Sequence, residues 1–178
     1  MPRLFVAIDL PVSVRAALSA IQPPGVPGLR LVDRSRMHLT LHFLGEADTG
    51  LISSALQEVA APPVPLAIQG VGRFGGKSTV LWAGVRETGE LSKLHSRIAA
   101  ALSGVGYVPE SRPYHPHVTL ARCEPRVPAA VVMQFLDRHA GFALPGFLVD
   151  RFHLYSSELS LDAPVYRREA TIGLAGGS

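Results

Sequence analysis

The sequence contains one short strand motif twice, and this repeat limits the folds that the chain can adopt. His38–Leu41 and His117–Leu120 both read His, aliphatic, Thr, aliphatic. Their β-branched and aliphatic residues have the two-residue alternation that is typical of a half-buried strand. Successive side chains of a strand point to opposite faces, so each motif presents its His and Thr on one face and its aliphatic residues on the other. If two such strands line one groove, two imidazoles and two hydroxyls meet there, which is the outline of a metal-free phosphate site.

The composition indicates an ordered globular protein. Of the 178 residues, 47% are hydrophobic and 17% are charged, a balance that favours a packed core over disorder. We expect one domain over residues 1–178, made of two similar, intertwined lobes. No stretch approaches the roughly 20 apolar residues of a membrane span, and Asp9 interrupts the first apolar run, so neither a membrane segment nor a signal peptide is expected.

Charge and cysteine content set further limits. The formal net charge of +3 permits an anionic substrate but is too small to indicate high-affinity binding of nucleic acid. The single cysteine, Cys123, excludes an intramolecular disulfide and is typical of the reducing cytoplasm, where we expect the protein to act.

Hydrophobic periodicity and turn residues predict a mixture of strands and helices. The expected strands cover residues 3–9, 29–32, 38–44, 64–72, 78–85, 115–123, 147–156 and 165–174. Helices are expected from Pro11 to Pro23, over 51–61, over 90–102, and from Pro128 to near Gly141. In both halves a motif strand is followed by a helix and then by a pair of strands. This order indicates a degenerate internal duplication without a linker between the halves.

The repeated residues suit acid–base cleavage of a phosphodiester. Without a metal ion, such cleavage needs a base for the attacking oxygen and an acid for the leaving oxygen. Histidine suits both roles because its ordinary pKa, about 6.5, lets neutral and protonated forms coexist near neutrality. The hydroxyls of Thr40 and Thr119 can donate hydrogen bonds to the non-bridging phosphate oxygens. The spacing alone does not tell the proton donor from the acceptor.

With these motifs the chain resembles a known family, the two-histidine (2H) phosphoesterases. It is most similar to the bacterial and archaeal RNA 2′,3′-cyclic phosphodiesterases, which are also described as 2′-5′ RNA ligase-like. The resemblance covers nearly the whole chain and includes the blocks at 3–8, 38–46, 81–85 and 115–122. All four motif positions match the family pattern.

The resemblance implies a bilobal α+β fold, with two antiparallel sheets lining a central groove and helices outside. It also implies hydrolysis of a terminal 2′,3′-cyclic phosphate of RNA to a 2′-phosphate, without a cofactor. By analogy with the family, His38 is the proton donor to the departing 3′ oxygen and His117 is the acceptor that activates water. Thr40 and Thr119 hold the phosphate. The expected partner is an RNA end, with tRNA fragments and small cyclic nucleotides as candidates, and the expected state is a monomer.

Five residues near the motifs are candidates for binding the substrate. Arg122 can reach the phosphate only if a bulge or the strand end moves it, because strict alternation places it opposite its motif histidine. Phe43 suits stacking on an unpaired base, although its place in the alternation equally suits the core. His42 and His115 share a face with the motif histidines and either tune the site or end the strands. Phe74, beside a glycine turn, is a candidate wall of the groove.

The other chemically distinctive residues are assigned to structure. Trp82 is expected in the core, and Cys123 lacks a partner base and is expected to be structural. No Cys/His spacing or carboxylate cluster indicates zinc, so no metal site is expected.

Other functions remain compatible with the same site. An RNA 2′-5′ ligase would run the chemistry in reverse with a 5′-hydroxyl as nucleophile. Water at about 55 M competes with that hydroxyl, so hydrolysis dominates unless the groove aligns a second RNA end. A non-catalytic module for RNA ends would bind without turnover, and a phosphodiesterase for small cyclic nucleotides would need only a short groove.

Overall fold

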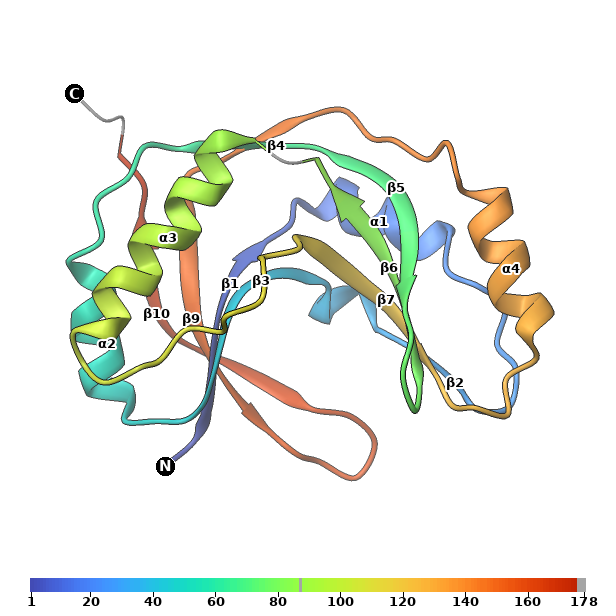
Figure 1. Ribbon diagram of the computed structural model, residues 1–178, viewed down its shortest axis with the longest axis horizontal. Helices are drawn as coiled ribbons and strands as arrows, with labels where there is room; N and C mark the ends of the chain where they lie inside the picture. Colours follow the sequence, from blue (N-terminus) through green and yellow to red (C-terminus); the bar gives the residue numbers. More distant parts are fainter. Residues whose placement is uncertain (87, 176–178) are drawn as a thin grey trace.

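The computed structural model describes residues 1–86 and 88–175, which form antiparallel sheets with helices on their outer sides (Figure 1). In chain order the elements are β1 (Arg3–Asp9), α1 (Val12–Ala20), β2 (Leu29–Leu31), the 3-10 turn η1 (Arg34–Arg36), β3 (His38–Glu46), α2 (Thr49–Gln57), β4 (Val64–Leu66), β5 (Ile68–Phe74), β6 (Thr79–Val85), α3 (Gly89–Ser103), β7 (His117–Cys123), α4 (Ala129–Arg138), β8 (Phe147–Val149), β9 (Arg151–Glu158) and β10 (Val165–Gly173). The expected α+β class is confirmed. No helix within the described residues is long and apolar enough to cross a membrane.

The two large sheets exchange strands between the halves of the chain. The first sheet has the order β10–β9–β1–β3, and the second has the order β2–β7–β6–β5. β9 and β10 follow the second motif strand, β7, along the chain, but they join the sheet of the first motif strand, β3. In the same way β5 and β6 follow β3 but join the sheet of β7. Each sheet therefore contains strands from both halves.

One continuous hydrophobic core joins the sheets to the helices. α2 and α3 run beside the first sheet, and α4 flanks the second (Figure 1). Every helix contributes fully or nearly fully buried side chains to the same cluster, among them Leu18, Leu56, Leu94 and Phe135. Burying a side chain of this size stabilises the fold by about 1.5–3 kcal/mol. The apolar faces of the motif strands, such as Leu39, pack into this core.

Two expected strands are each divided into two. The segment 64–72 breaks at Ala67 into β4 and β5, and the segment 147–156 breaks at Asp150 into β8 and β9. β4 and β8 pair with each other in a separate two-stranded sheet. Hydrophobic periodicity does not reveal these breaks, because both parts of each segment carry buried apolar residues and only their pairing partners differ.

Helix boundaries follow capping residues. α2 begins two residues before the expected start because the Asp48 side chain accepts a hydrogen bond from the backbone N–H of Leu51 at 2.9 Å. It ends at Gln57, short of the expected 61, so the residues before Pro62 are not helical, as is common ahead of proline. α3 agrees with its expected range within one residue at each end, and Thr88 caps it.

Each motif strand contains a β-bulge at the same place. Leu41 is the extra residue of β3, because its two neighbours pair with consecutive residues of β1. Leu120 has the equivalent position in β7 against β6. A bulge shifts the two-residue alternation, so side chains beyond it change face. Phe43 and Arg122, which hold equivalent positions after the two bulges, thereby move to the face of the motif histidines, and both are exposed.

Gln22, just after α1, holds the second bulge. Its side-chain amide nitrogen donates to the carbonyl oxygens of Val32 and Leu120, both at 2.8 Å. The backbone N–H of Val32 also donates to the Leu120 carbonyl, at 3.0 Å. Gln22 therefore connects α1 to the motif strand at the residue where the alternation shifts.

We predict that Gln22→Ala destabilises the protein by about 1–3 kcal/mol, because two partly buried carbonyls lose a donor. Urea unfolding followed by far-UV circular dichroism measures the change. Gln134→Ala, at an exposed position of α4, is the matched control and should change the free energy of unfolding by less than about 0.5 kcal/mol. Equal effects of the two substitutions would contradict the role given to Gln22.

Candidate active site

The two motif histidines have the same local geometry. Nδ1 of His38 lies 2.7 Å from the carbonyl oxygen of Arg36, and Nδ1 of His117 lies 2.8 Å from that of His115. A carbonyl only accepts, so in both rings Nδ1 carries the hydrogen and donates it. This bond fixes the tautomer and leaves Nε2 of each ring for proton transfer.

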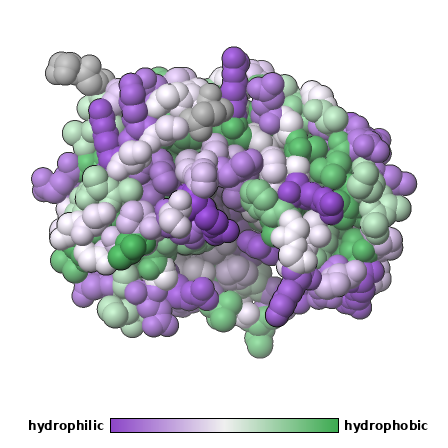
Figure 2. Space-filling view, in the orientation of Figure 1, coloured by the Kyte–Doolittle hydropathy of each residue, from purple (hydrophilic) through white to green (hydrophobic). Residues whose placement is uncertain are grey.

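The two motifs lie close together although they belong to different sheets. A positive charge on His117 lowers the pKa of His38, so the two rings interact electrostatically. Tyr114, three residues before His117, donates its hydroxyl hydrogen to the backbone carbonyl of Thr40 at 2.8 Å. The molecule is hollowed near the middle of one face, and hydrophilic residues gather around the hollow (Figure 2). The fold thus brings the two motif histidines near each other.

Threonines accompany both histidines. The Thr40 hydroxyl lies 2.9 Å from Nε2 of His38, so the two groups share a hydrogen bond at the reactive nitrogen. Thr119 is half-buried, as are both histidines and Thr40, on the side of its strand away from the buried Val118. Each motif therefore presents a hydroxyl beside an imidazole, as the alternation predicts.

Burial lowers the pKa of both motif histidines, but their charged neighbours differ. For His38, burial is the largest cause, while the hydrogen bond to the Arg36 carbonyl and the negative charge of Asp9 act to raise the pKa. For His117, burial again lowers the pKa most; the hydrogen bond to the His115 carbonyl acts to raise the pKa, and positive charges on His115 and Arg122 lower it further. The neighbours thus favour a proton on His38 over one on His117.

Aromatic rings form a wall on each side of the site. On the first sheet, Phe5 stacks on His38 with ring centroids 5.1 Å apart, and Tyr166 meets His38 edge-on at 5.5 Å. On the second sheet, the ring of Phe74 lies edge-on to His117 at 4.9 Å, and that of Trp82 lies at 6.1 Å. Each of the two histidines is thus in contact with two aromatic rings of its own sheet.

A model of the 2′-5′ RNA ligase superfamily matches residues 10–160 of this chain. The chain belongs to this superfamily. The match agrees with the resemblance to two-histidine phosphoesterases that the motifs indicate.

Individual relatives extend the match over nearly the whole chain. The RNA 2′,3′-cyclic phosphodiesterase of Archaeoglobus fulgidus is 31% identical over 172 residues, which cover 93% of this chain and 96% of the relative. The structure of TT0787 of Thermus thermophilus superimposes with a TM-score of 0.81 at 28% identity, covering 99% of this chain and 100% of that one. The structure of Escherichia coli LigT complexed with 3′-AMP has a TM-score of 0.76 at 26% identity, and the match covers 97% of this chain and 98% of that one. The expected fold is therefore that of known superfamily members.

Four of the five flanking candidates lie beside the motif histidines or the aromatic rings that contact them. His115 contacts Phe74 at 5.4 Å between ring centroids, which places both on the wall of the second sheet. Arg122 is exposed and interacts with the charge of His117. Phe43 is 65% exposed and lies 6.2 Å from Phe5 between ring centroids. The bulges explain why Arg122 and Phe43 depart from strict alternation.

His42 does not share the face of His38, so the prediction from strict alternation is wrong at this position. It follows the bulge at Leu41, is 5% exposed, and stacks on His95 of α3 with ring centroids 4.0 Å apart. Its Nε2 donates to the backbone carbonyl of His95 at 3.0 Å. Burial of His95, followed by the charge of His42, lowers the pKa of His95 to about 4. His42 thus connects the first motif strand to α3.

Trp82 also differs from its expected place in the core. It is only half-buried and pairs across the strands with Thr119, so it lies on the face of the motif histidines. Its ring packs over Gly72, where an added Cβ would come within 2.3 Å of the indole. The alternation does contain this signal, because Leu81 and Ala83 are the buried neighbours on the opposite face.

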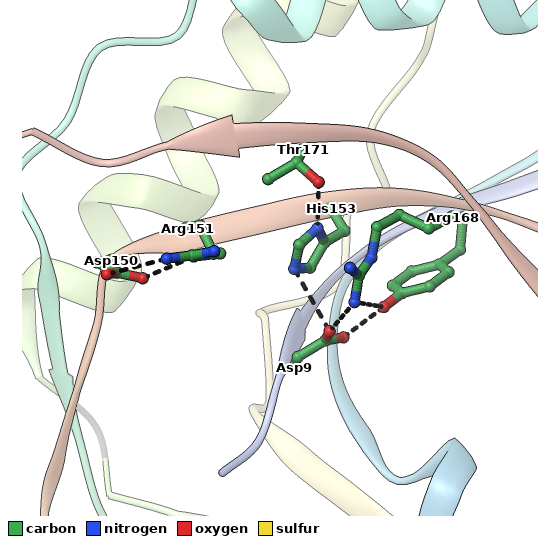
Figure 3. A network of polar contacts seen from close by, with 7 residues as sticks. Asp9, Asp150, Arg151, His153, Arg168 and Thr171 are labelled. Carbon is green, nitrogen blue, oxygen red and sulfur yellow. Dashed lines mark hydrogen bonds and ion pairs between the residues drawn. The ribbon is translucent and has the colours of Figure 1, made fainter.

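Asp9 is the main site residue that motif analysis misses. It lies opposite His38 in the register of β1 and β3. The Tyr155 hydroxyl donates to its Oδ1 at 2.5 Å, the Arg168 guanidinium donates to its Oδ2 at 2.6 Å, and His153 Nε2 lies 3.4 Å from Oδ2 (Figure 3). Burial, followed by the hydrogen bond to Asp9, raises the pKa of Tyr155 to about 12, so Tyr155 stays a donor. The network holds the Asp9 carboxylate beside His38.

The described part of the chain contains no group of three or more His, Cys, Asp or Glu side chains arranged to hold a metal ion. The seven histidines of the sequence are instead distributed between the two motifs, the contact with α3, the Asp9 network and the end of α4. Acid–base chemistry by His38 and His117 is what this arrangement can supply.

We predict that Asp9→Asn lowers the pKa of His38 further below its ordinary value and leaves that of His117 unchanged. The carboxylate stabilises the protonated imidazole of His38, so its removal favours the neutral ring. NMR titration of the histidine ring protons measures both values. Asp150→Asn, which removes an exposed carboxylate paired with Arg151, is the control. A rise in the pKa of His38, or parallel shifts of the two rings, would contradict the asymmetry described above.

Proposed function

We propose that this protein hydrolyses the terminal 2′,3′-cyclic phosphate of RNA to a 2′-phosphate by a two-histidine mechanism that needs no metal. The observation that carries the proposal is the matched pair His38 and His117, each with its Nδ1 bound to a carbonyl, so that Nε2 is the nitrogen that can exchange a proton; in His38 this nitrogen also shares a hydrogen bond with the Thr40 hydroxyl. The curated relative from Archaeoglobus fulgidus, named an RNA 2′,3′-cyclic phosphodiesterase, supports the same activity.

The charges beside the histidines support different roles for them. The negative charge of Asp9 favours the protonated form of His38, whereas the positive charge of Arg122 favours the neutral form of His117. A protonated imidazole can donate a proton and a neutral one can accept it. We therefore assign His38 as the donor and His117 as the acceptor, in agreement with the roles that the family resemblance implies.

In the proposed reaction, Nε2 of His117 takes a proton from water while the water oxygen attacks phosphorus. The bond from phosphorus to O3′ breaks, and His38 gives the proton on its Nε2 to O3′. The product is a 2′-phosphate beside a 3′-hydroxyl, and proton exchange with solvent restores both rings. The hydroxyls of Thr40 and Thr119 donate to the non-bridging oxygens, where negative charge grows in the transition state.

The proposed partner is an RNA end. The exposed ring of Phe43 offers a surface on which a base can stack, and the guanidinium of Arg122 suits a phosphate oxygen. Phe74 and His115 line the phosphate site on the side of His117. Ends of tRNA fragments and small cyclic nucleotides both meet these requirements.

We propose that the protein acts as a monomer in the cytoplasm, where its single, buried cysteine stays reduced.

Ligation is the second candidate, because the matching family model is that of the 2′-5′ RNA ligase superfamily. A 5′-hydroxyl would then replace water as the partner of the cyclic phosphate. Hydrolysis is favoured because water, at about 55 M, competes unless a second RNA end is held in line. Comparing ligated with hydrolysed product from tRNA halves separates the two activities.

We predict that the protein converts an oligonucleotide ending in a 2′,3′-cyclic phosphate to a 2′-phosphate in excess EDTA. His38→Ala and His117→Ala should each lower kcat by about 10²–10⁴, because each removes one proton-transfer group. Product identity by chromatography and initial rates provide the measurements.

His139→Ala is the matched control for these substitutions, because His139 follows α4 and lies in neither motif. Its kcat should equal that of the unchanged protein. Turnover that requires added divalent metal would contradict the mechanism, and a 3′-phosphate product would contradict the assigned regiochemistry. Binding of the cyclic end without turnover would indicate the non-catalytic module.

We predict a bell-shaped dependence of kcat/KM on pH with its maximum below about 6.5, the ordinary histidine pKa. The rate falls at high pH when His38 loses its proton and at low pH when His117 gains one. Both pKa values are lowered in the free protein. Both limbs of the pH profile therefore move to lower pH. A maximum well above 6.5 at low substrate concentration would show that other groups carry the protons.

A further inference from the structure

A pocket of about 450 Å³ opens beside His38. Its walls come from the end of β1, from α1, from η1 and from the paired strands β9 and β10. Among the described residues, His38 lines this pocket, but His117 and Thr119 do not. The pocket therefore adjoins the phosphate site on the side of the proposed proton donor.

The pocket is rich in guanidinium groups. Arg15, Arg36 and Arg168 line it, and Asp9 is its single acidic lining residue. The Asp9 carboxylate is already satisfied by Arg168 at 2.6 Å and by the Tyr155 hydroxyl at 2.5 Å. The formal charge of the lining is thus positive, and the excess lies on Arg15 and Arg36.

Acidic side chains of residues 1–86 and 88–175 form no ion pair with these two arginines; the exposed Asp33, which is outside the pocket lining, interacts with the charge of Arg36. Arg36 makes one long hydrogen bond, 3.4 Å, to the carbonyl of Pro164. Nε of Arg15 is buried without a hydrogen-bond partner. Buried N–H groups are normally paired, so an arginine left in this state on a pocket wall suits an anionic ligand.

The chemistry of the proposed reaction indicates which anion. This step rests on the proposed function, in which His38 protonates O3′. The ribose that carries O3′ must then lie on the side of His38, and the chain continues from its 5′ oxygen in the same direction. The first anionic group in that direction is the phosphodiester that joins the terminal nucleotide to the preceding one.

We propose that the pocket lined by Arg15 and Arg36 binds the phosphodiester on the 5′ side of the terminal nucleotide. The planar guanidinium fork matches two oxygens of such a group. Contacts of this kind position nucleic acid without reading its sequence. The site thereby selects the ends of RNA chains over cyclic mononucleotides, which lack this phosphate.

The test compares three substrates that differ only at the 5′ position: adenosine 2′,3′-cyclic phosphate, the same compound with a 5′-phosphate, and a dinucleotide with a 2′,3′-cyclic end. We expect kcat/KM to be about tenfold or more higher for the dinucleotide than for the 5′-hydroxyl compound. Arg15→Gln and Arg36→Gln should each remove most of this advantage through KM. In Arg15→Gln, turnover of the 5′-hydroxyl compound should stay within about twofold.

Arg138→Gln, which removes the same charge from the exposed end of α4, is the matched control and should retain the full advantage. Arg15→Lys, which keeps the charge but loses the fork, should give an intermediate value, and thermal melting checks that each variant is folded. The advantage should also shrink as salt is raised.

Three results would overturn the proposal: no advantage for the dinucleotide, equal loss on all three substrates in Arg15→Gln, or an advantage confined to the 5′-phosphate compound.

Absence of turnover on every substrate would instead refute the proposed function. Equilibrium binding of the dinucleotide 2′-phosphate, compared with adenosine 2′-phosphate, then still decides the role of the pocket. Tighter binding of the dinucleotide that depends on Arg15 supports it, and equal binding rejects it.

Discussion

One hydrogen bond, made twice, decides what this site can do. In each motif Nδ1 of the histidine donates to the carbonyl two residues earlier in the chain. The acceptor belongs to the backbone, so the tautomer does not depend on a side chain that can rotate away. The ring is then fixed in direction, and Nε2 is the nitrogen that remains for a proton. The aromatic walls, the hydroxyls and the charged neighbours all act on rings that the backbone has already oriented.

The difference between the two rings comes from their surroundings. His38 lies opposite Asp9, whereas His117 lies near Arg122. Two copies of one motif therefore have different charged neighbours, a carboxylate beside His38 and the cationic side chains of His115 and Arg122 beside His117. Asp9 keeps its position because Tyr155 and Arg168 both bind it. Two copies of the same residue can in this way suit different roles in the proton transfer that we propose.

Sequence periodicity predicts the first four residues of each motif correctly and fails beyond them. A bulge inserts Leu41 and reverses the faces of the residues that follow, so His42 lies under α3 and Phe43 is exposed. Bulges depend on the pairing partner and leave no clear mark in the composition of one strand. The expectation for Trp82 fails for a different reason, since it rests on the usual burial of large aromatic rings and not on the alternation of its own strand.

Contacts between distant parts of the chain are harder still to predict from the sequence. Asp9 meets Tyr155 and Arg168 across 146 and 159 positions, and no local pattern connects them. The exchange of β9 and β10 into the sheet of β3 is equally hidden, because strand order along the chain does not fix strand order in a sheet. The family resemblance predicts the overall architecture, and hydrophobic periodicity predicts the individual helices and strands.

The exchanged strands also determine when the protein can become active during its synthesis. The sheet that carries His38 is completed only by β9 and β10, whose residues 151–173 are made after both motifs. Pairing of such distant segments is slow to form, and domains are usually made from the N-terminus onward. A nascent chain that has both motifs but lacks these strands also lacks Tyr166 beside His38 and the two side chains that bind Asp9, so a truncated translation product would present the motif histidines in an incomplete site.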